Sequence, residues 1–186
     1  MHKYNPDIHH RRSIRLQGYD YSAAGIYFVT ICTRDKLCLF GDVVGDEMVL
    51  NDAGSIVERC WRDIPVHFSD AVLNEFIVMP NHVHGIVVLN ATNLLPNVGA
   101  NHSVRANDYS PLPRNHPKGT SRTIGSIIRG FKIGVTKRIG YSLWQRNYYE
   151  RIIRDDEERS RVVEYIINNP RKWKEDILWT NSTCFE

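Results

Sequence analysis

The chain has 186 residues with 24 Lys and Arg against 21 Asp and Glu, so its formal net charge is only +3. The length suits one domain with a real core, and the apolar and charged content is that of an ordinary globular protein. No apolar run approaches a membrane span and no signal-peptide core is present, so we expect no membrane partner. The four cysteines have no C-x-x-C spacing, which predicts reduced thiols in a cytoplasmic protein rather than a disulfide frame or zinc cluster.

The first half of the chain predicts a strand, a short hairpin and a helix. The β-branched and aromatic run at 25–33, GIYFVTICT, is typical of a strand. Residues 43–50 predict a small hairpin arm. Asn51 or Asp52 is suited to cap a helix over 53–64, where apolar residues recur with helical spacing.

Two histidines then stand inside a predicted hairpin, whose strands cover about 70–79 and 82–89. Side chains i and i+2 leave the same face of a strand, so His82 and His84 project together while Val83 points the other way. Two imidazoles on a rigid strand suit a metal site or a proton-handling site. The alternative, two histidines on a solvated sheet face, is the commoner case for an isolated His-x-His.

The second half predicts a long loop, two helices and one further extended segment. Residues 90–121 are rich in Asn, Pro, Ser and Gly, which predicts a flexible insertion or a substrate-side loop. Helical spacing returns over 120–139, an extended or strand segment follows at 142–153, and a helix with an acidic start covers 155–168. This element order favours an α+β protein, a ferredoxin-like antiparallel sheet with helices packed mainly on one face.

The basic residues are unevenly distributed along the chain. Between Tyr109 and Tyr149 there are eight Lys and Arg residues and no Asp or Glu, and the N-terminal arm is also basic. A nearly neutral chain with such a block predicts one cationic face for a polyanion. The alternative is a basic helix that is merely solvated.

The last helix carries a tyrosine that its packing does not require. Tyr165 and Asn169 are i and i+4, so they share one helix face. Neighbouring Val and Ile residues already supply an apolar face. Taken alone, however, a helical tyrosine beside Val and Ile is most often a packing residue.

Three segments in this order resemble a known family: IVMPNHVHGIVVL, LWQRNYYERIIRD and VVEYIINNPRKW. They are similar to the single-tyrosine HUH transposases of the IS200/IS605 type, and most of all to the REP-associated tyrosine transposases. The segments YFVTICTRDK and GFKIGVTKRI extend the resemblance to about residues 10–175. It implies an HUH endonuclease fold in a single domain over 19–175, preceded by a basic arm at 1–18 and followed by a tail at 176–186.

The resemblance also implies roles for individual residues. His82 and His84 match the metal ligands, Tyr165 matches the nucleophile, and Asn169 matches the third protein ligand, where IS200 relatives often carry Gln. Tyr148 and Tyr149 are rival nucleophiles, but they precede the helix and lack an amide one turn on. The side chains expected to contact DNA are Arg11, Arg12, Arg15, Arg122, Arg129, Lys132, Lys137, Arg138 and Arg146.

The implied function is that of a divalent-metal-dependent endonuclease and strand transferase, with Mg²⁺ or Mn²⁺ as cofactor. Its DNA would be single-stranded or hairpin DNA, such as REP-like palindromes, and the intermediate a 5′-phosphotyrosine. A bacterial, nucleoid-associated location follows from this resemblance. It leaves open whether the protein is a homodimer that supplies its tyrosine across the interface.

Two other functions remain open at this point. One is a catalytically idle, domesticated protein that binds palindromic DNA. The other is a hydrolase or structural metal protein that uses His82 and His84 with a carboxylate such as Glu75.

Overall fold

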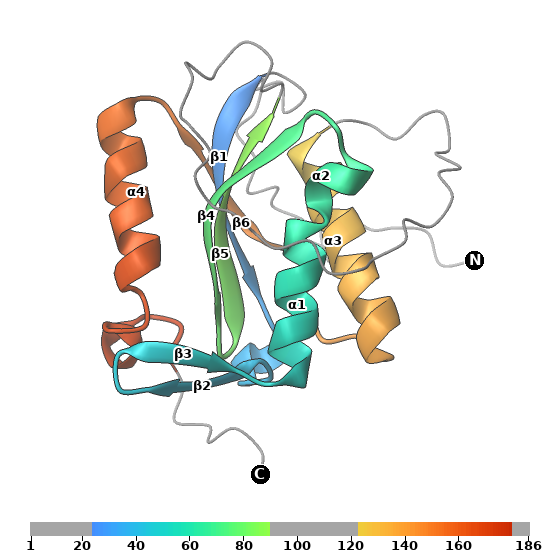
Figure 1. The fold of residues 1–186 in the computed structure, drawn as a ribbon, viewed down its shortest axis with the longest axis vertical. Helices are drawn as coiled ribbons and strands as arrows, with labels where there is room; N and C mark the ends of the chain where they lie inside the picture. Colours follow the sequence, from blue (N-terminus) through green and yellow to red (C-terminus); the bar gives the residue numbers. More distant parts are fainter. Residues whose placement is uncertain (1–23, 90–122, 180–186) are drawn as a thin grey trace, which may run out of the picture.

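The computed structural model of the protein describes residues 24–89 and 123–179. Within these residues, the main element is a four-stranded antiparallel sheet with the order β4-β5-β1-β6 (Figure 1). Its strands are β1 Gly25–Cys32, β4 Ala71–Met79, β5 His82–Leu89 and β6 Tyr149–Ile153. With α1 (Asp52–Arg62) after β1 and α3 (Ile124–Ile139) after β5, the chain follows a β-α-β-β-α-β path. The predicted ferredoxin-like α+β fold is therefore confirmed.

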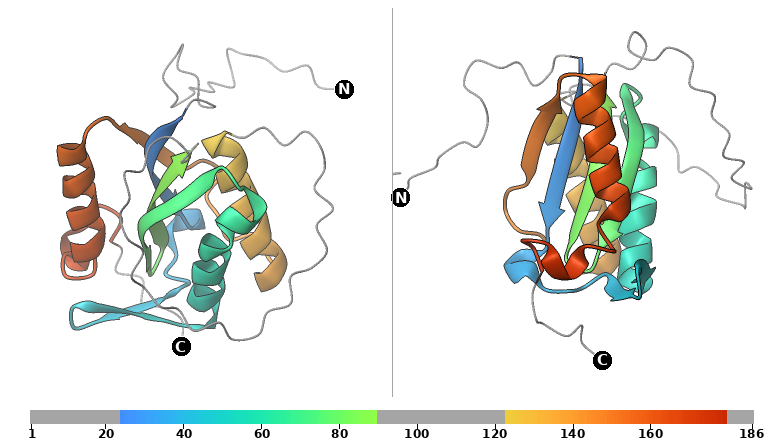
Figure 2. Two further views of the ribbon diagram at one scale, coloured as in Figure 1. Left: turned by 45° about the horizontal axis from the view of Figure 1, so that its top comes forward. Right: turned by 90° about the vertical axis from the view of Figure 1, so that its left-hand side faces the viewer.

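Helices lie on both faces of this sheet, with the larger layer on one of them. Helices α1 and α3 cover one face, together with the short α2 (Ile64–His67), and α4 (Asp156–Asn168) covers the other (Figures 1 and 2). The larger core fills the first layer and contains Trp61 and Phe131. A smaller apolar cluster holds α4 through Ile166. Helix α4 is thus the exception to the prediction that helices pack mainly on one face.

The ends of the helices follow local signals that the sequence contains. The Asn51 side chain accepts a hydrogen bond from the Gly54 amide at the start of α1, and Thr123 and Asp155 cap α3 and α4 in the same way. Gly140 ends α3 in the left-handed conformation, at φ 92°, which favours glycine.

The predicted hairpin arm is present and crosses one end of the sheet. It consists of β2 (Gly41–Val44) and β3 (Glu47–Leu50), and in Figure 1 it runs beneath the strands toward the chain that follows α4. Val43 packs against the cluster that contains Trp173, and Asp46 lies 3.8 Å from the Arg171 guanidinium. The arm therefore supports the segment that follows α4.

Two further predictions concern the segments outside these elements. The segment predicted at 142–153 is divided, because Trp144 forms an isolated bridge with Thr33 and the regular strand β6 begins only at Tyr149. The predicted arm at 1–18 and the loop at 90–121 lie outside the described residues. No helix within the described ranges has the length and apolar composition that crossing a membrane requires.

Gly85 provides a test of this packing. A Cβ at Gly85 would lie 2.3 Å from the Trp61 ring, which is fully buried. We expect Gly85→Ala to lower the free energy of unfolding by about 1–3 kcal/mol through overpacking, as measured by urea denaturation. Gly134→Ala is the matched control, because its Cβ would meet nothing closer than the Arg138 side chain at 3.7 Å. That helical change should be neutral or stabilise by up to about 1 kcal/mol. Equal stability of the two variants would contradict the packing described here.

Candidate metal and tyrosine site

The two histidines lie side by side on the face of the sheet that α4 covers. In the strand register, His84 stands between Thr30 and Ile77, two residues along from His82. Their ring centroids are 4.3 Å apart, and their exposed fractions are 0% and 2%. Val83 packs into the opposite core, as predicted. The interpretation as histidines on a solvated sheet face is therefore wrong.

Asn81 orients the His82 ring and assigns its proton. The Asn81 amide nitrogen donates to the carbonyl oxygens of Lys36 and Leu178, at 3.1 and 2.8 Å. Its oxygen consequently faces His82 Nδ1 at 2.8 Å, so Nδ1 is the nitrogen that donates. His82 Nε2 then carries a lone pair, and it is buried without a hydrogen-bond partner among the described residues. A histidine that binds a metal through one ring nitrogen typically donates the proton of the other to such an oxygen.

His84 is oriented in a similar way from β1. The Thr30 hydroxyl oxygen lies 2.9 Å from His84 Nδ1, and the Phe28 ring stacks on the imidazole with centroids 5.4 Å apart. The other nitrogen, Nε2, lies 3.2 Å from the hydroxyl oxygen of Tyr165. Helix α4 thus brings its tyrosine to a histidine of the same chain.

Tyr165 and Asn169 meet this pair from the end of α4. The Tyr165 side chain is 43% exposed, so its hydroxyl lies between a buried imidazole and solvent. Asn169 caps the C-terminal end of α4 and is 1% exposed. Its Oδ1 is buried without a hydrogen-bond partner within the described part of the chain. The predicted helix face therefore points toward both histidines.

Asp176 is the member of the site that the sequence did not predict. Its Oδ2 accepts hydrogen bonds from the Tyr165 hydroxyl at 3.2 Å and from the Asn169 amide at 3.1 Å. Possible ligand atoms of His82, His84 and Asp176 all lie within 4.8 Å of one another. Asp176 follows the 3₁₀ turn η3 (Trp173–Glu175) and is the first residue of the predicted tail. A single carboxylate in that position forms no motif, so no local signal identifies it.

Burial sets the protonation of these groups. It lowers the pKa of His82 well below its usual value, and the adjacent His84 lowers it further. Burial also lowers the pKa of His84 to about 4, against the opposing effect of Asp176. The pKa of Tyr165 is raised to about 12, first by burial and then by the Asp176 carboxylate. At neutral pH both imidazoles are therefore in the neutral form that binds metals, and the phenol keeps its proton.

The donor set fits a divalent cation. It combines two imidazole nitrogens with a carboxylate and an amide oxygen, from His82, His84, Asp176 and Asn169. Two of these atoms, His82 Nε2 and Asn169 Oδ1, are buried acceptors without a partner in the described structure, which is costly unless something binds them. The His82, His84 and Asp176 group can thus hold a metal ion.

Comparison with known proteins finds relatives in sequence and in fold. The chain is 46% identical over 184 residues to a Haemophilus influenzae protein that is named only as uncharacterized, across 96% of this chain and 98% of that protein. It is 24% identical over 154 residues to a second protein of that organism, whose name assigns it provisionally to the REP-associated tyrosine transposases; the match covers 82% of this chain and 74% of that protein. A solved structure of a REP-associated tyrosine transposase bound to a REP hairpin shares the fold, with a TM-score of 0.55 and 19% identity over 87% of this chain and 74% of that chain.

The chain is similar in sequence to a protein named for the REP-associated tyrosine transposases and shares the fold of a solved one. The resemblance drawn from its sequence motifs is thereby confirmed. No protein-family model matches the sequence. This similarity supports a DNA-processing role of the transposase type.

The structure also separates the rival tyrosines. Tyr149 pairs with Thr30 in the sheet, so it shares the face of His84 but lies two strands away, about 10 Å by normal strand spacing. The Tyr148 hydroxyl donates to Glu150 at 2.6 Å, and its ring packs on the other side of the sheet, against the larger core. Of the three, Tyr165 is the one whose hydroxyl lies within hydrogen-bond distance of a site histidine in the described structure.

The predicted DNA-contacting cations fall into three groups. Arg11, Arg12, Arg15 and Arg122 lie outside the described residues. Arg138 is turned toward α1, where its guanidinium contacts Cys60 Sγ at 2.9 Å and Asp63 at 3.4 Å. The remaining four line one cavity beside α3: Arg129, Lys132, Lys137 and Arg146.

Lys132 differs from the other three because its ammonium is partly buried. It donates to the carbonyl oxygens of Gln145 and Asn147, at 2.8 and 2.9 Å, and so joins the backbone of residues 145–147 to α3. Burial lowers its pKa from 10.5 to about 8, against the opposing effect of Cys32. The unfolded chain therefore binds more protons than the native protein between about pH 8 and pH 10.5.

This titration predicts a pH dependence of stability. In that window the contribution of Lys132 to the free energy of unfolding rises with pH, because the native state no longer has to bury a charge. We expect urea denaturation at a series of pH values to show that the free energy of unfolding rises more steeply with pH, or falls less steeply, in the wild type than in Lys132→Met. The variant should be less stable throughout, since it lacks both hydrogen bonds to the 145–147 backbone. Parallel curves would show that Lys132 titrates normally.

Proposed function

We propose that this protein is a metal-dependent endonuclease and strand transferase that acts on single-stranded DNA beside a hairpin, with Tyr165 as nucleophile. One observation carries the proposal. The Tyr165 hydroxyl lies 3.2 Å from a buried neutral imidazole, next to two buried ligand atoms that lack partners in the described chain. A half-exposed nucleophile beside a site suited to a cation is what attack on a phosphodiester requires.

The reaction can be written from the residues of this chain. The Tyr165 oxygen attacks the scissile phosphorus and loses its proton, the bond from phosphorus to the 3′ oxygen breaks, and that oxygen takes up a proton. The products are a 5′-phosphotyrosine and a free 3′-OH, with no net gain or loss of protons. Attack of a second 3′-OH on that phosphotyrosine restores a phosphodiester and releases Tyr165. Because the phosphotyrosine conserves the bond energy, rejoining needs no nucleotide, which agrees with the lack of a P-loop motif in the sequence.

His82, His84 and Asp176, with Asn169, are the residues that would hold the cation. A bound Mg²⁺ or Mn²⁺ would polarise the phosphate and stabilise the charge that develops on it. Asn81 and Thr30 keep the two imidazoles in place for this role. Since Tyr165 meets His84 of its own chain, we propose that one chain forms a complete site.

The substrate class follows from the charge distribution and from the relatives. The exposed cations beside α3 suit a phosphate backbone, and the solved relative is described as bound to a REP hairpin. We therefore propose hairpins of REP-like palindromes, with adjoining single strand, as the DNA that this protein processes.

Covalent trapping tests the nucleophile. The wild type incubated with Mn²⁺ and a 3′-labelled hairpin from the palindromes that flank the gene should form a covalent protein–DNA adduct, which chelator abolishes. Tyr165→Phe should form none, because it lacks the attacking oxygen. Tyr149→Phe is the matched control: it removes a hydroxyl from the same face of the sheet but should still form adduct.

The same assay separates the competing functions. If Tyr165→Phe formed adduct and Tyr149→Phe did not, Tyr149 would be the nucleophile and Tyr165 would not. Tight hairpin binding without adduct under any metal would favour the idle palindrome-binding protein. Stoichiometric metal binding without DNA affinity would instead favour a hydrolase or a structural metal protein.

A metal titration tests the ligand set. By isothermal calorimetry, Asp176→Ala should bind Mn²⁺ at least about tenfold more weakly than the wild type, because it loses an oxygen that would bind the cation directly. His82→Ala should weaken binding further. Glu175→Ala is the control, since it removes an exposed carboxylate from the neighbouring position and should leave the affinity unchanged. Equal affinities for Asp176→Ala and Glu175→Ala would remove Asp176 from the site.

A further inference from the structure

A basic groove lies on the side of the sheet opposite to Tyr165. It is a cavity of about 450 Å³ between α3 and the 142–148 segment, and none of its lining residues is acidic. Arg129, Lys137 and Arg146 are exposed at its walls, and Ile133, which is 48% exposed, lies between the two α3 cations. The groove thus offers both positive charge and apolar surface, as single-stranded nucleic acid sites do.

The groove continues into a second cavity of about 740 Å³. The two cavities share Ser142, Trp144, Gln145 and Arg146, and the second one adds the turn η1, Arg34–Lys36. Arg34 is exposed, and its guanidinium lies 3.4 Å from the Ser142 hydroxyl, which leaves most of its N–H donors for other partners. Asp35 is the one acidic residue among those that line either cavity. The basic surface therefore extends from α3 to η1.

The turn η1 connects this surface to the candidate active site. Lys36 Nζ donates to the carbonyl of Ile177, the residue after Asp176, and the Lys36 carbonyl accepts from Asn81. Asp35 and Lys36 both have φ of 55°, a left-handed backbone conformation that residues other than glycine rarely adopt. Two such residues in succession store backbone strain, and strain of this kind clusters at functional sites. Here it occurs where the groove meets the segment that carries Asp176.

We propose that the single strand next to the hairpin runs from Tyr165 across η1 into this groove, where Arg34, Arg146 and the cations of α3 bind its phosphates. The proposal rests on the proposed function, because it assigns a path to the strand that Tyr165 cleaves. Arg129 and Lys137 are eight residues apart, about 12 Å along the helix, so they contact a run of nucleotides rather than one phosphate. Lys132 builds the wall of the groove, because it is bonded to two carbonyl oxygens.

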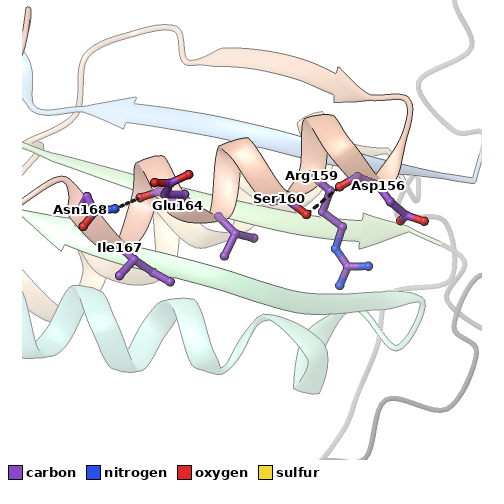
Figure 3. Close-up of a pocket in the computed structure, with 7 residues that line it drawn as sticks. Asp156, Arg159, Ser160, Glu164, Ile167 and Asn168 are labelled. Carbon is purple, nitrogen blue, oxygen red and sulfur yellow. Dashed lines mark hydrogen bonds between the residues drawn. The ribbon is translucent and has the colours of Figure 1, made fainter.

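Other surfaces fit this strand less well. Arg138 is directed to Cys60 and Asp63 and does not line either cavity. The outer side of α4 also forms a hollow, which Figure 3 shows, but it places the Asp156 and Glu164 carboxylates beside the single cation Arg159. A phosphate backbone would be repelled there, so Arg159 serves as the matched control for loss of one exposed charge.

The test measures binding by fluorescence anisotropy, with all variants in the Tyr165→Phe background so that no DNA is cleaved. The probes are the labelled hairpin with single-stranded flanks and the same hairpin with blunt ends. We expect weaker binding of the flanked hairpin, by about fivefold, in each of the variants Arg34→Ala, Arg129→Ala and Arg146→Ala. The slope of log affinity against log salt concentration should also be smaller in each, by about 0.7. The same variants should bind the blunt hairpin like their parent, and Arg159→Ala should match the parent on both probes.

Each other result overturns the proposal. Groove variants that bind flanked DNA as well as Arg159→Ala does would show that the strand runs elsewhere. Equal losses on flanked and blunt hairpins would place the hairpin itself in the groove. A third probe, the same hairpin with RNA flanks, would make RNA the occupant if it bound more strongly than the DNA-flanked one. Failure of the proposed function would give a different result. The protein with Tyr165 intact would then form no metal-dependent adduct on saturating DNA, while the groove variants would still bind the flanked hairpin more weakly than their parent.

Discussion

The site depends on the buried side chain of Asn81, which joins three segments that are distant in the sequence. Its amide donates to the carbonyl of Lys36 in η1 and to that of Leu178 after η3, and its oxygen faces His82. Because all three positions of the amide group are used, the side chain cannot rotate without leaving a buried polar group unpaired, which costs roughly 1–3 kcal/mol. The ring of His82, the turn η1 and the segment of Asp176 are therefore fixed relative to one another.

This arrangement explains how a site with few protein charges can be rigid. The imidazoles stand on β5, which is paired with neighbours on both sides, and Trp173 packs 5.8 Å from the His82 ring. Tyr165 instead comes from α4, which rests on the smaller apolar cluster. The two candidate histidine ligands thus stand on a strand in the middle of the sheet, whereas the candidate nucleophile stands on a helix that rests on the smaller cluster and has a half-exposed side chain. A fixed cation site with a more accessible tyrosine suits a reaction in which DNA must enter and leave.

Local pattern predicted much of this structure, and the rest depends on packing between distant segments. The period of two at His82 and His84, and the i, i+4 spacing of Tyr165 and Asn169, are properties of one strand and one helix, so the sequence contains them. Asp176 follows a short turn without periodicity, and its position depends on Trp173 and on the Asn81 bond to Leu178. No pattern within the tail contains that information.

The cations beside α3 show the same limit. Helical spacing places Lys137 and Arg138 off the apolar stripe, and by that criterion both face solvent. Only the packing of α1 against α3 decides that Arg138 meets Cys60 and Asp63. Arg34 was not predicted, because a single arginine after a strand carries no signal until the 142–146 segment is placed beside it.

Charge distribution explains why the net charge of +3 says so little about function. The site itself contributes one negative charge, from Asp176, because its imidazoles are neutral and Asn169 is uncharged. A divalent cation there would leave a net positive centre, which attracts a phosphate instead of repelling it. The remaining phosphates of a DNA strand need cations elsewhere, and the described structure provides them along α3, Arg146 and Arg34, with one acidic residue among them. Many of the acidic residues in the described structure lie instead on α1, on the β2–β3 arm and at the start of α4, and none of these lines either cavity.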